Sequence, residues 1–389
     1  MQKKVTREVL FWYDQVCYPK FYYSIKIIGL HKLNYIDFNK HDFIPVNKPR
    51  LPKHSTLLKY LSLIDENKIY SNFGPLEVDL RRRYAELFGV GRDQIVLVNN
   101  GTQGLISSAL TSGYSKVCIP SFSCATIGSL ILQTRMEHKF VDIDLDNWTL
   151  NVEDNYSKYL NLFVLPFGSS INNLNILSQP NVLIDAEASI FNLDLNGIKM
   201  NANLVIMVSL HATKPLGGVE GGILICGSSE KASELREFIT FGFSGHKTIN
   251  RSGSNMKMSE YSAAVCHSTL DFIEITRKKW HDLNLIRNKI NDVIGINPNF
   301  LNPNDITPYW IIQLKDSDER LDLINKLNKN KIEFRLWWGR GPYKEKAFED
   351  NSKQTFKNAE YVADRYLGLP FFEDINQSEL SRIIEVLSN

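Results

Sequence analysis

The chain has 389 residues, of which 43% are hydrophobic and 23% charged, and its 45 lysines and arginines nearly balance 43 aspartates and glutamates. This composition is typical of a globular protein with one large domain and a smaller one, and a net charge of +2 gives no indication of a nucleic-acid surface. We therefore expect a small-molecule ligand and no nucleic-acid or membrane partner.

The amino-terminal residues 1–47 precede a proline-punctuated stretch and are interpreted as an added arm. Their apolar residues are interrupted by charged residues and a proline, which does not fit a signal peptide or a spanning helix. The five cysteines of the chain are widely spaced and form neither a disulfide framework nor a zinc pattern. We expect a reducing, cytoplasmic location and no metal site.

Short apolar runs follow one another through the middle of the chain and predict seven strands. They cover residues 94–100, 116–120, 139–144, 162–166, 181–185, 203–210 and 222–226. Strands that are apolar along their whole length are typical of a mostly parallel sheet with helices on both faces. The fold class is therefore α/β. Only residues 211–221 separate the last two runs, which predicts an antiparallel return rather than a crossover helix.

After about residue 255 the pattern changes. One long helical segment begins near residue 258, and strand signals follow at 308–315 and 331–336. We predict a large domain over residues 48–250 and a smaller α+β domain over residues 251–389.

The first polar group at the end of a predicted strand lies in the sequence NNGTQ. A strand ends, the chain turns at Gly101, and a helix begins through Thr102 and Gln103. Free N–H groups and the positive end of a helix dipole bind phosphate, so this turn is a candidate anion site. The alternative is a plain helix cap at Thr102.

The second polar group is Asp185, at the end of the apolar run NVLID. A carboxylate that loses water there needs a cationic partner, and a protonated ring nitrogen is one. The alternative is a structural cap of a following helix.

The third group is the stretch VSLHATKPLGGVEGG, residues 208–222, which holds Lys214 among small residues. An enclosed lysine with a readily lost proton is suited to a Schiff base with a carbonyl group. Ser209 and His211, just before it, are candidates for a phosphate oxygen and a ring edge. The alternative is an ordinary solvated lysine.

The fourth group is Asn255, in the polar loop before the long helix. It is either the cap of that helix or a donor to an anion bound by a neighbouring subunit.

These groups, in this order, resemble the DegT/StrS family of sugar aminotransferases. The resemblance extends from KPRLP at residues 48–52 to residues 367–387, and its most specific part is S-x-H-x-x-K at 209–214, followed by G-G-x-E-G-G. It implies the type I fold of pyridoxal 5'-phosphate enzymes, that cofactor, and a homodimer with shared active sites.

The resemblance also implies a role for each residue. Lys214 is the catalytic lysine, which bonds to the cofactor and moves protons. Asp185 pairs with the ring nitrogen. The cofactor phosphate is held by Gly101, Thr102, Gln103 and Ser209, and by Asn255 from the other subunit.

Two positions depart from the family pattern. Three residues after Asp185 the family has Gln or His near the cofactor hydroxyl, whereas this chain has Ala188. Where the family has an aromatic residue against the ring, Cys124 aligns, and a small shift would bring Phe122 there instead.

The resemblance implies transfer of an amino group from L-glutamate to a keto or aldehyde sugar, with a nucleotide-linked sugar for surface polysaccharide or lipopolysaccharide as the first interpretation. Candidate substrate contacts are His211, Trp337, Arg340 and Tyr343, the last three in the loop 333–348. The alternative for that loop is a packed tryptophan pair and solvated arginines.

Two other functions stay open. One is an aminotransferase that acts on a free sugar acid such as an oxidised 3-deoxy-octulosonate. The other is a non-catalytic cofactor-binding partner or sensor. Some relatives are dehydratases with histidine in place of the lysine, and the presence of Lys214 favours a transaminase.

Overall fold

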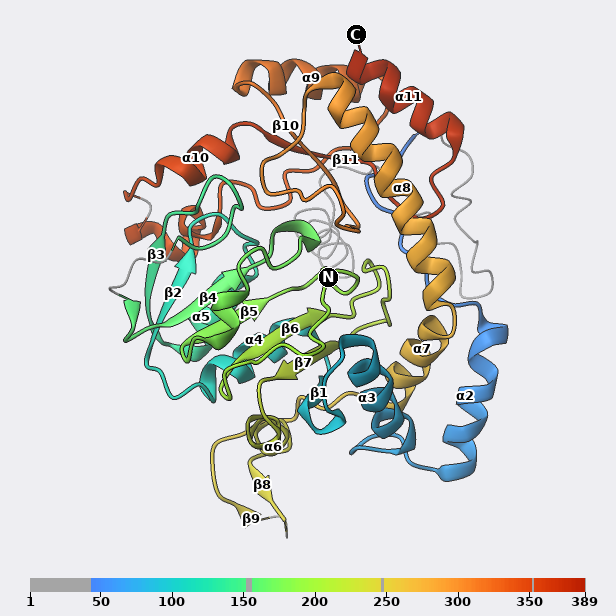
Figure 1. The fold of residues 1–389 in the computed structure, drawn as a ribbon, viewed down its shortest axis with the longest axis vertical. Coiled ribbons are helices and arrows are strands. Elements are labelled where there is room, and N and C mark those ends of the chain that lie inside the picture. The colour runs from blue at the N-terminus through green and yellow to red at the C-terminus, as the bar shows by residue number, and fades with distance from the viewer. Residues whose placement is uncertain (1–42, 152–155, 246–247, 352, 389) are drawn as a thin grey trace, which may run out of the picture. The chain divides into compact units, whose positions relative to one another are not determined.

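The computed structural model describes residues 43–151, 156–245, 248–351 and 353–388 (Figure 1). Most of the predicted arm, residues 1–42, lies outside them. Its role, and the boundary between a large and a small domain near residue 250, stay predictions.

All seven predicted strands are present and form one sheet. They are β1 (Ile95–Val98), β2 (Lys116–Pro120), β3 (Glu137–Val141), β4 (Leu160–Val164), β5 (Val182–Asp185), β6 (Val205–Ser209) and β7 (Gly222–Cys226). Their order is β1-β7-β6-β5-β4-β2-β3. β7 runs antiparallel to both of its neighbours, and the other pairs are parallel. The predicted antiparallel return is confirmed.

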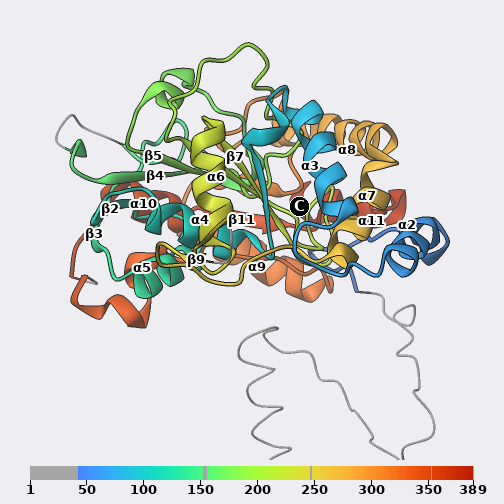
Figure 2. The same ribbon diagram turned by 90° about the horizontal axis from the view of Figure 1, so that it is seen from below.

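Both faces of the sheet are buried, which explains why its strands are apolar along their whole length. On one face the strands pack against α4 (Gly101–Leu110), α5 (Ile127–Thr134) and α6 (Ser229–Phe238). On the other face they pack against α3 (Pro75–Phe88) and α7 (Glu260–Leu270), as Figure 2 shows from below. Alternate residues of β1 divide between the two cores: Ile95 and Leu97 belong to one, Val96 and Val98 to the other.

A third core lies around a small antiparallel sheet of β10 (Trp310–Gln313) and β11 (Tyr366–Leu369). It is covered by α8 (Ile273–Ile294), α9 (Ser317–Lys329) and α11 (Gln377–Ser388). Figure 1 shows α8 running from α7 to the end where α9 and α11 lie. The strand predicted at 308–315 is therefore present. The one predicted at 331–336 is reduced to isolated bridges at Ile332 and Arg335.

The remaining elements are short or peripheral. They are α2 (His54–Asn67), η2 (Arg92–Gln94), η4 (Pro166–Gly168), η5 (Leu174–Ser178), β8 (Phe243–Ser244), β9 (Thr248–Ile249), η6 (Pro342–Lys344), η7 (Lys346–Asn351) and α10 (Lys357–Ala363). In the described parts of the chain, no helix has the length and apolar character needed to cross a bilayer.

The helical segment expected from residue 258 is two helices rather than one, because α7 ends at Leu270 and α8 begins at Ile273. The cap of α7 is Ser259, whose hydroxyl accepts the N–H of Ser262. A capping role for Asn255 is therefore wrong, since it lies four residues too early.

Candidate active site

The turn after β1 holds the start of α4. Asn100 caps this helix: its Oδ1 accepts the N–H of Gln103 at 2.8 Å, and its carbonyl accepts the N–H of Gly104. The cap is thus Asn100, and the alternative of a cap at Thr102 is wrong. Helix geometry leaves the N–H groups of Gly101 and Thr102 without acceptors inside the helix, so they are suited to an anion.

Close packing brings this helix start against the end of β6. A Cβ at Gly101 would lie 2.9 Å from Met207 Sδ and 3.5 Å from Ser209 Cβ. Glycine is therefore required for the approach, and Ser209 comes to lie beside the first turn of α4. Gly101, Thr102, Gln103 and Ser209, which we predicted as one phosphate site, are brought together.

Asp185 is the last residue of β5 and is only 4% exposed. Its Oδ1 accepts the N–H of Glu187, and no helix lies between β5 and β6, so the alternative of a helix cap is wrong. The pKa of Asp185 is raised to about 8, and burial of the carboxyl group is the largest cause. The nearby charge of Glu187 also contributes to this rise, whereas Lys214 and the N–H of Glu187 act against it.

Lys214 lies in the loop between β6 and β7 and is 8% exposed, so the alternative of a solvated lysine is wrong. Its Nζ donates to Tyr309 Oη at 2.8 Å and pairs with Glu187 Oε2 at 3.2 Å. Burial lowers the pKa of Lys214, but Glu187 and Tyr309 together raise it above its ordinary value. The lysine is enclosed as expected, yet it holds its proton more firmly than expected.

Tyr309 and Glu187 were not predicted from the sequence. Tyr309 precedes β10, and its carbonyl accepts a hydrogen bond from the buried Arg287 of α8 at 2.9 Å. Glu187 is two residues beyond Asp185, and this spacing in the segment IDAEAS was a signal for a second acid at the same strand end. Nothing in the sequence pointed to Tyr309, because 95 residues separate it from Lys214.

Cys124 lies close enough to Glu187 and Asp185 for their charges to affect its thiol. Burial raises the pKa of its thiol, and the nearby charges of Glu187 and Asp185 raise it further. Phe122 is fully buried and makes edge contacts with Trp148, Trp338 and Tyr366. Because the Phe122 ring is packed among those three rings, Cys124 is the better candidate of the two to face a ligand.

Among the predicted substrate contacts, Trp337 packs against Tyr309, the hydrogen-bond partner of Lys214. Its ring centroid is 5.2 Å from that of Tyr309, and the Arg335 guanidinium lies over it at 4.9 Å. His211 is half-exposed, and its Nδ1 lies 2.8 Å from Thr213 Oγ1. Both residues are on the loops that carry or adjoin Lys214.

The other two predicted contacts have partners elsewhere in the chain. Arg340 pairs with Asp364 at 2.7 Å, and the fully buried Tyr343 donates to Glu360 at 3.2 Å. Trp338 stacks on Phe167 at 4.3 Å, so the alternative of a packed tryptophan holds for that residue. Substrate binding by Arg340 and Tyr343 stays a prediction without a contact to the lysine cluster.

Asn255 is exposed, and its Oδ1 accepts from Lys257 Nζ at 2.6 Å. Its backbone forms a bridge with Thr240. An exposed amide is compatible with the predicted contact to a second subunit, which stays a prediction.

The donor set fits pyridoxal 5'-phosphate. The first N–H groups of α4 and the Ser209 hydroxyl are suited to its phosphate, and Lys214 is the amine for its aldehyde. The fit rests on Asp185: a buried acid with a raised pKa becomes a stable carboxylate when a protonated ring nitrogen lies against it. The chain thus offers a partner for the phosphate, for the aldehyde and for the ring nitrogen of that cofactor.

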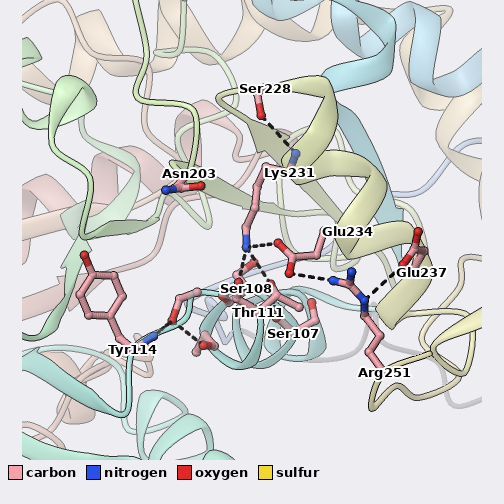
Figure 3. A network of polar contacts seen from close by, with 12 residues as sticks. Ser107, Ser108, Thr111, Tyr114, Asn203, Ser228, Lys231, Glu234, Glu237 and Arg251 are labelled. Atoms are coloured by element: carbon pink, nitrogen blue, oxygen red, sulfur yellow. Dashed lines mark hydrogen bonds and ion pairs between the residues drawn. The ribbon is translucent and has the colours of Figure 1, made fainter. Parts of the chain in front are cut away.

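A polar network holds the far end of α4 (Figure 3). Lys231 of α6, 5% exposed, donates to the carbonyl and to Oγ1 of Thr111, the residue that caps the carboxyl end of α4, and pairs with Glu234 at 2.9 Å. Arg251 binds Glu234 at 2.8 Å and Glu237 at 3.2 Å. The network connects α4, which carries the predicted phosphate site, to the loop that continues to Asn255.

Comparison with known proteins gives consistent matches. The sequence profile of the DegT/DnrJ/EryC1/StrS aminotransferase family matches residues 53–157 and 182–388. A dTDP-4-amino-4,6-dideoxy-D-glucose transaminase of Shigella dysenteriae is 27% identical over 365 residues, which is 88% of this chain and 97% of the relative. One from Escherichia coli is 27% identical over 373 residues, 88% of this chain and 98% of the relative.

The fold is also that of a solved structure from Bacillus cereus described as a PLP-dependent aminotransferase. The two share a TM-score of 0.75 at 23% identity, over 89% of this chain and 100% of the other. This likeness confirms the predicted type I fold of pyridoxal phosphate enzymes.

Proposed function

The chain belongs to the DegT/DnrJ/EryC1/StrS aminotransferase family, and from this premise we propose that it transfers an amino group from L-glutamate to a nucleotide-linked keto sugar. It is a PLP-dependent sugar aminotransferase, and pyridoxal 5'-phosphate is its cofactor. The observation that carries the proposal is the buried Lys214 beside Asp185 at the carboxyl ends of β5 and β6.

Each residue has a proposed task. When bound, the cofactor supplies an aldehyde that takes up the amino group and a ring that accepts electrons from the carbon losing its proton. Asp185 keeps the ring nitrogen protonated. Lys214 moves the proton between carbons, and the first turn of α4 with Ser209 holds the phosphate. The aromatic and apolar side chains around Tyr309 exclude water from the lysine.

The nucleotide-linked substrate is supported by the Shigella and Escherichia relatives, whose names specify a dTDP-linked 4-amino sugar. The 4-keto form of such a sugar is the acceptor to test first. Trp337 and His211 adjoin the lysine loop and are the proposed substrate contacts. Surface polysaccharide or lipopolysaccharide synthesis in the cytoplasm is the proposed setting.

We further propose that the active form is a homodimer, in which Asn255 of one copy reaches the cofactor phosphate of the other. The exposure of Asn255 supports this arrangement, because its side chain is accessible to a second copy.

A spectral experiment tests the proposal. Purified protein loaded with the cofactor should change absorbance on addition of L-glutamate alone, as the cofactor takes up the amino group, and a dTDP-linked 4-keto sugar should reverse the change. Lys214→Ala should bind the cofactor without a borohydride-reducible bond to the protein. A reducible bond that survives in that variant contradicts the role of Lys214. A spectrum restored by a free sugar acid instead of the nucleotide sugar contradicts the proposed acceptor.

A further inference from the structure

The carboxylate of Glu187 occupies an unusual place beside the lysine. It lies 3.2 Å from Lys214 Nζ, in a site where the lysine side chain is 7% exposed and the glutamate side chain 25%. Ala188, the next residue, stands where the family has a polar side chain toward the cofactor. This chain therefore lacks a polar side chain at position 188 but has a carboxylate beside the lysine at position 187.

The position of Glu187 is fixed by its backbone. Its N–H donates to Asp185 Oδ1 at 3.1 Å, and its carbonyl accepts the N–H of Ser209 at 3.1 Å. The segment is therefore held on both sides, to the end of β5 and to the end of β6. Since β6 leads directly into the loop of Lys214, the carboxylate and the amine are positioned by neighbouring strands.

The groups that face Lys214 come from two other segments of the chain. Glu187 and Asp185 come from the end of β5, and Tyr309 comes from the segment before β10. Cys124, from the turn after β2, interacts with Glu187, Asp185 and Tyr309 rather than with the lysine itself. Only Glu187 forms an ion pair with the lysine among the described residues.

We propose that Glu187 is a positioning residue that makes Lys214 a stronger proton acceptor by pairing with its ammonium form. In the proton transfer, a C–H bond of the substrate breaks, its proton goes to the lone pair of the neutral Nζ, and the electron pair stays on carbon. The ammonium that forms is stabilised by the carboxylate at 3.2 Å. The proposal rests on the role of Lys214 given under the proposed function.

Neither of the other two oxygen-bearing neighbours serves as well. Tyr309 is 8% exposed, and burial raises the pKa of its phenol, so it stays neutral and offers a hydrogen bond rather than a charge. Asp185 is 4% exposed and is committed to the ring nitrogen in the proposed function. Glu187 is the charged group that remains for the lysine.

The pH dependence of Lys214 reactivity in the full-length protein without cofactor tests the pairing directly. The protein is labelled with acetic anhydride across a pH series, and acetylation of Lys214 is measured by peptide mass spectrometry. In Glu187→Gln the labelling midpoint should fall by at least about one pH unit, because an opposite charge at this distance shifts a pKa by roughly 1–3 units. At a fixed pH below the midpoint, this is at least about tenfold faster labelling.

Two further variants keep the test decisive. Glu187→Asp retains the charge on a shorter side chain and should give a smaller shift in the same direction. Glu230→Gln makes the same chemical change on the exposed face of α6 and should leave the Lys214 profile unchanged. A Glu187→Gln profile equal to that of the parent protein overturns the proposal.

A second measurement separates this proposal from the proposed function. In protein loaded with cofactor, Glu187→Gln should increase the deuterium isotope effect on kcat with L-glutamate deuterated at its α-carbon, because proton transfer becomes slower. If the labelling midpoint shifts but no spectral change with glutamate occurs in any variant, the pairing stands and the proposed amino donor is wrong. An isotope effect unchanged by Glu187→Gln in an active enzyme contradicts the role in proton transfer.

Discussion

At the scale of single residues, the site combines groups that are costly to bury. Asp185 is 4% exposed and Lys214 is 8% exposed, and each depends on the charges around it. Burial of an ionisable group is unfavourable unless a partner compensates, so the protein without cofactor retains part of this cost. In the proposed function the cofactor supplies a cation for Asp185, so its binding should also stabilise the folded protein.

Asp185 gives a prediction about pH. Its pKa is about 8 in the folded protein against an ordinary value of 3.8, so between these values the folded state holds a proton that the unfolded state has released. The stability of the cofactor-free protein should therefore fall as pH rises from about 4 to about 8. Asp185→Asn removes this dependence, and the variant should melt at a higher temperature than the parent protein at pH 8, with a smaller difference at pH 5.

Thermal unfolding of the cofactor-free proteins at both pH values checks this prediction. Asp146→Asn, a matched change at an exposed aspartate, should show no such pattern. With cofactor added, the order should reverse at pH 8, since the amide of Asp185→Asn cannot pair with a protonated ring nitrogen. A stability difference that is independent of pH contradicts the assigned pKa.

At the scale of elements, the start of α4 depends on contacts at its other end. The carboxyl end of a helix exposes carbonyl oxygens without intrahelical donors, and Lys231 supplies a buried donor to one of them at Thr111 (Figure 3). The predicted phosphate site lies at the first turn of α4, and we expect the orientation of that turn to depend on this attachment to α6.

Lys231→Met should therefore reduce the free energy of unfolding by about 1–3 kcal/mol, since it leaves the Thr111 carbonyl without its buried donor and Glu234 with Arg251 as its remaining cation. Its affinity for pyridoxal 5'-phosphate should fall as well. Urea unfolding and a cofactor titration measure the two effects. Lys278→Met removes an exposed pair with Asp282 on α8 and should change neither quantity measurably. Equal effects of the two variants contradict the role of the network.

At the scale of the whole molecule, the proposed dimer predicts complementation between two defective variants. Lys214→Ala lacks the lysine, and Asn255→Ala lacks the amide that we propose to act across the interface. In a mixed dimer one site carries both defects and the other carries neither. Random exchange of equal amounts should therefore restore about one quarter of the sites.

Activity of the mixture after subunit exchange measures this outcome, with each variant alone as the baseline. Activity that never exceeds the average of the two separate variants contradicts a shared site. Sedimentation of both variants checks that they assemble alike, so a negative result is not caused by failure to associate.

The amino-acid sequence alone was sufficient to predict the sheet and to select the candidate residues for the site. Strands buried on both faces must be apolar throughout, so all seven were visible as runs. Asp185 ends a strand, Gly101 and Lys214 follow strand ends, and parallel strands bring such ends to one edge of the sheet. Local pattern failed at the caps, because Asn99, Asn100 and Thr102 are all suitable cap residues and only backbone conformation selects Asn100.

The neighbours of the lysine, by contrast, became visible in the folded structure. Tyr309 reaches Lys214 from 95 residues away, through a small sheet packed against α8. Tyr343 and Trp338 lie in the same sequence loop as Trp337, yet burial against other aromatic rings turns them to the core. The spacing of residues along the chain predicts local helices and strands. The protonation of Lys214 depends instead on groups that long-range packing brings within a few ångströms of its amine.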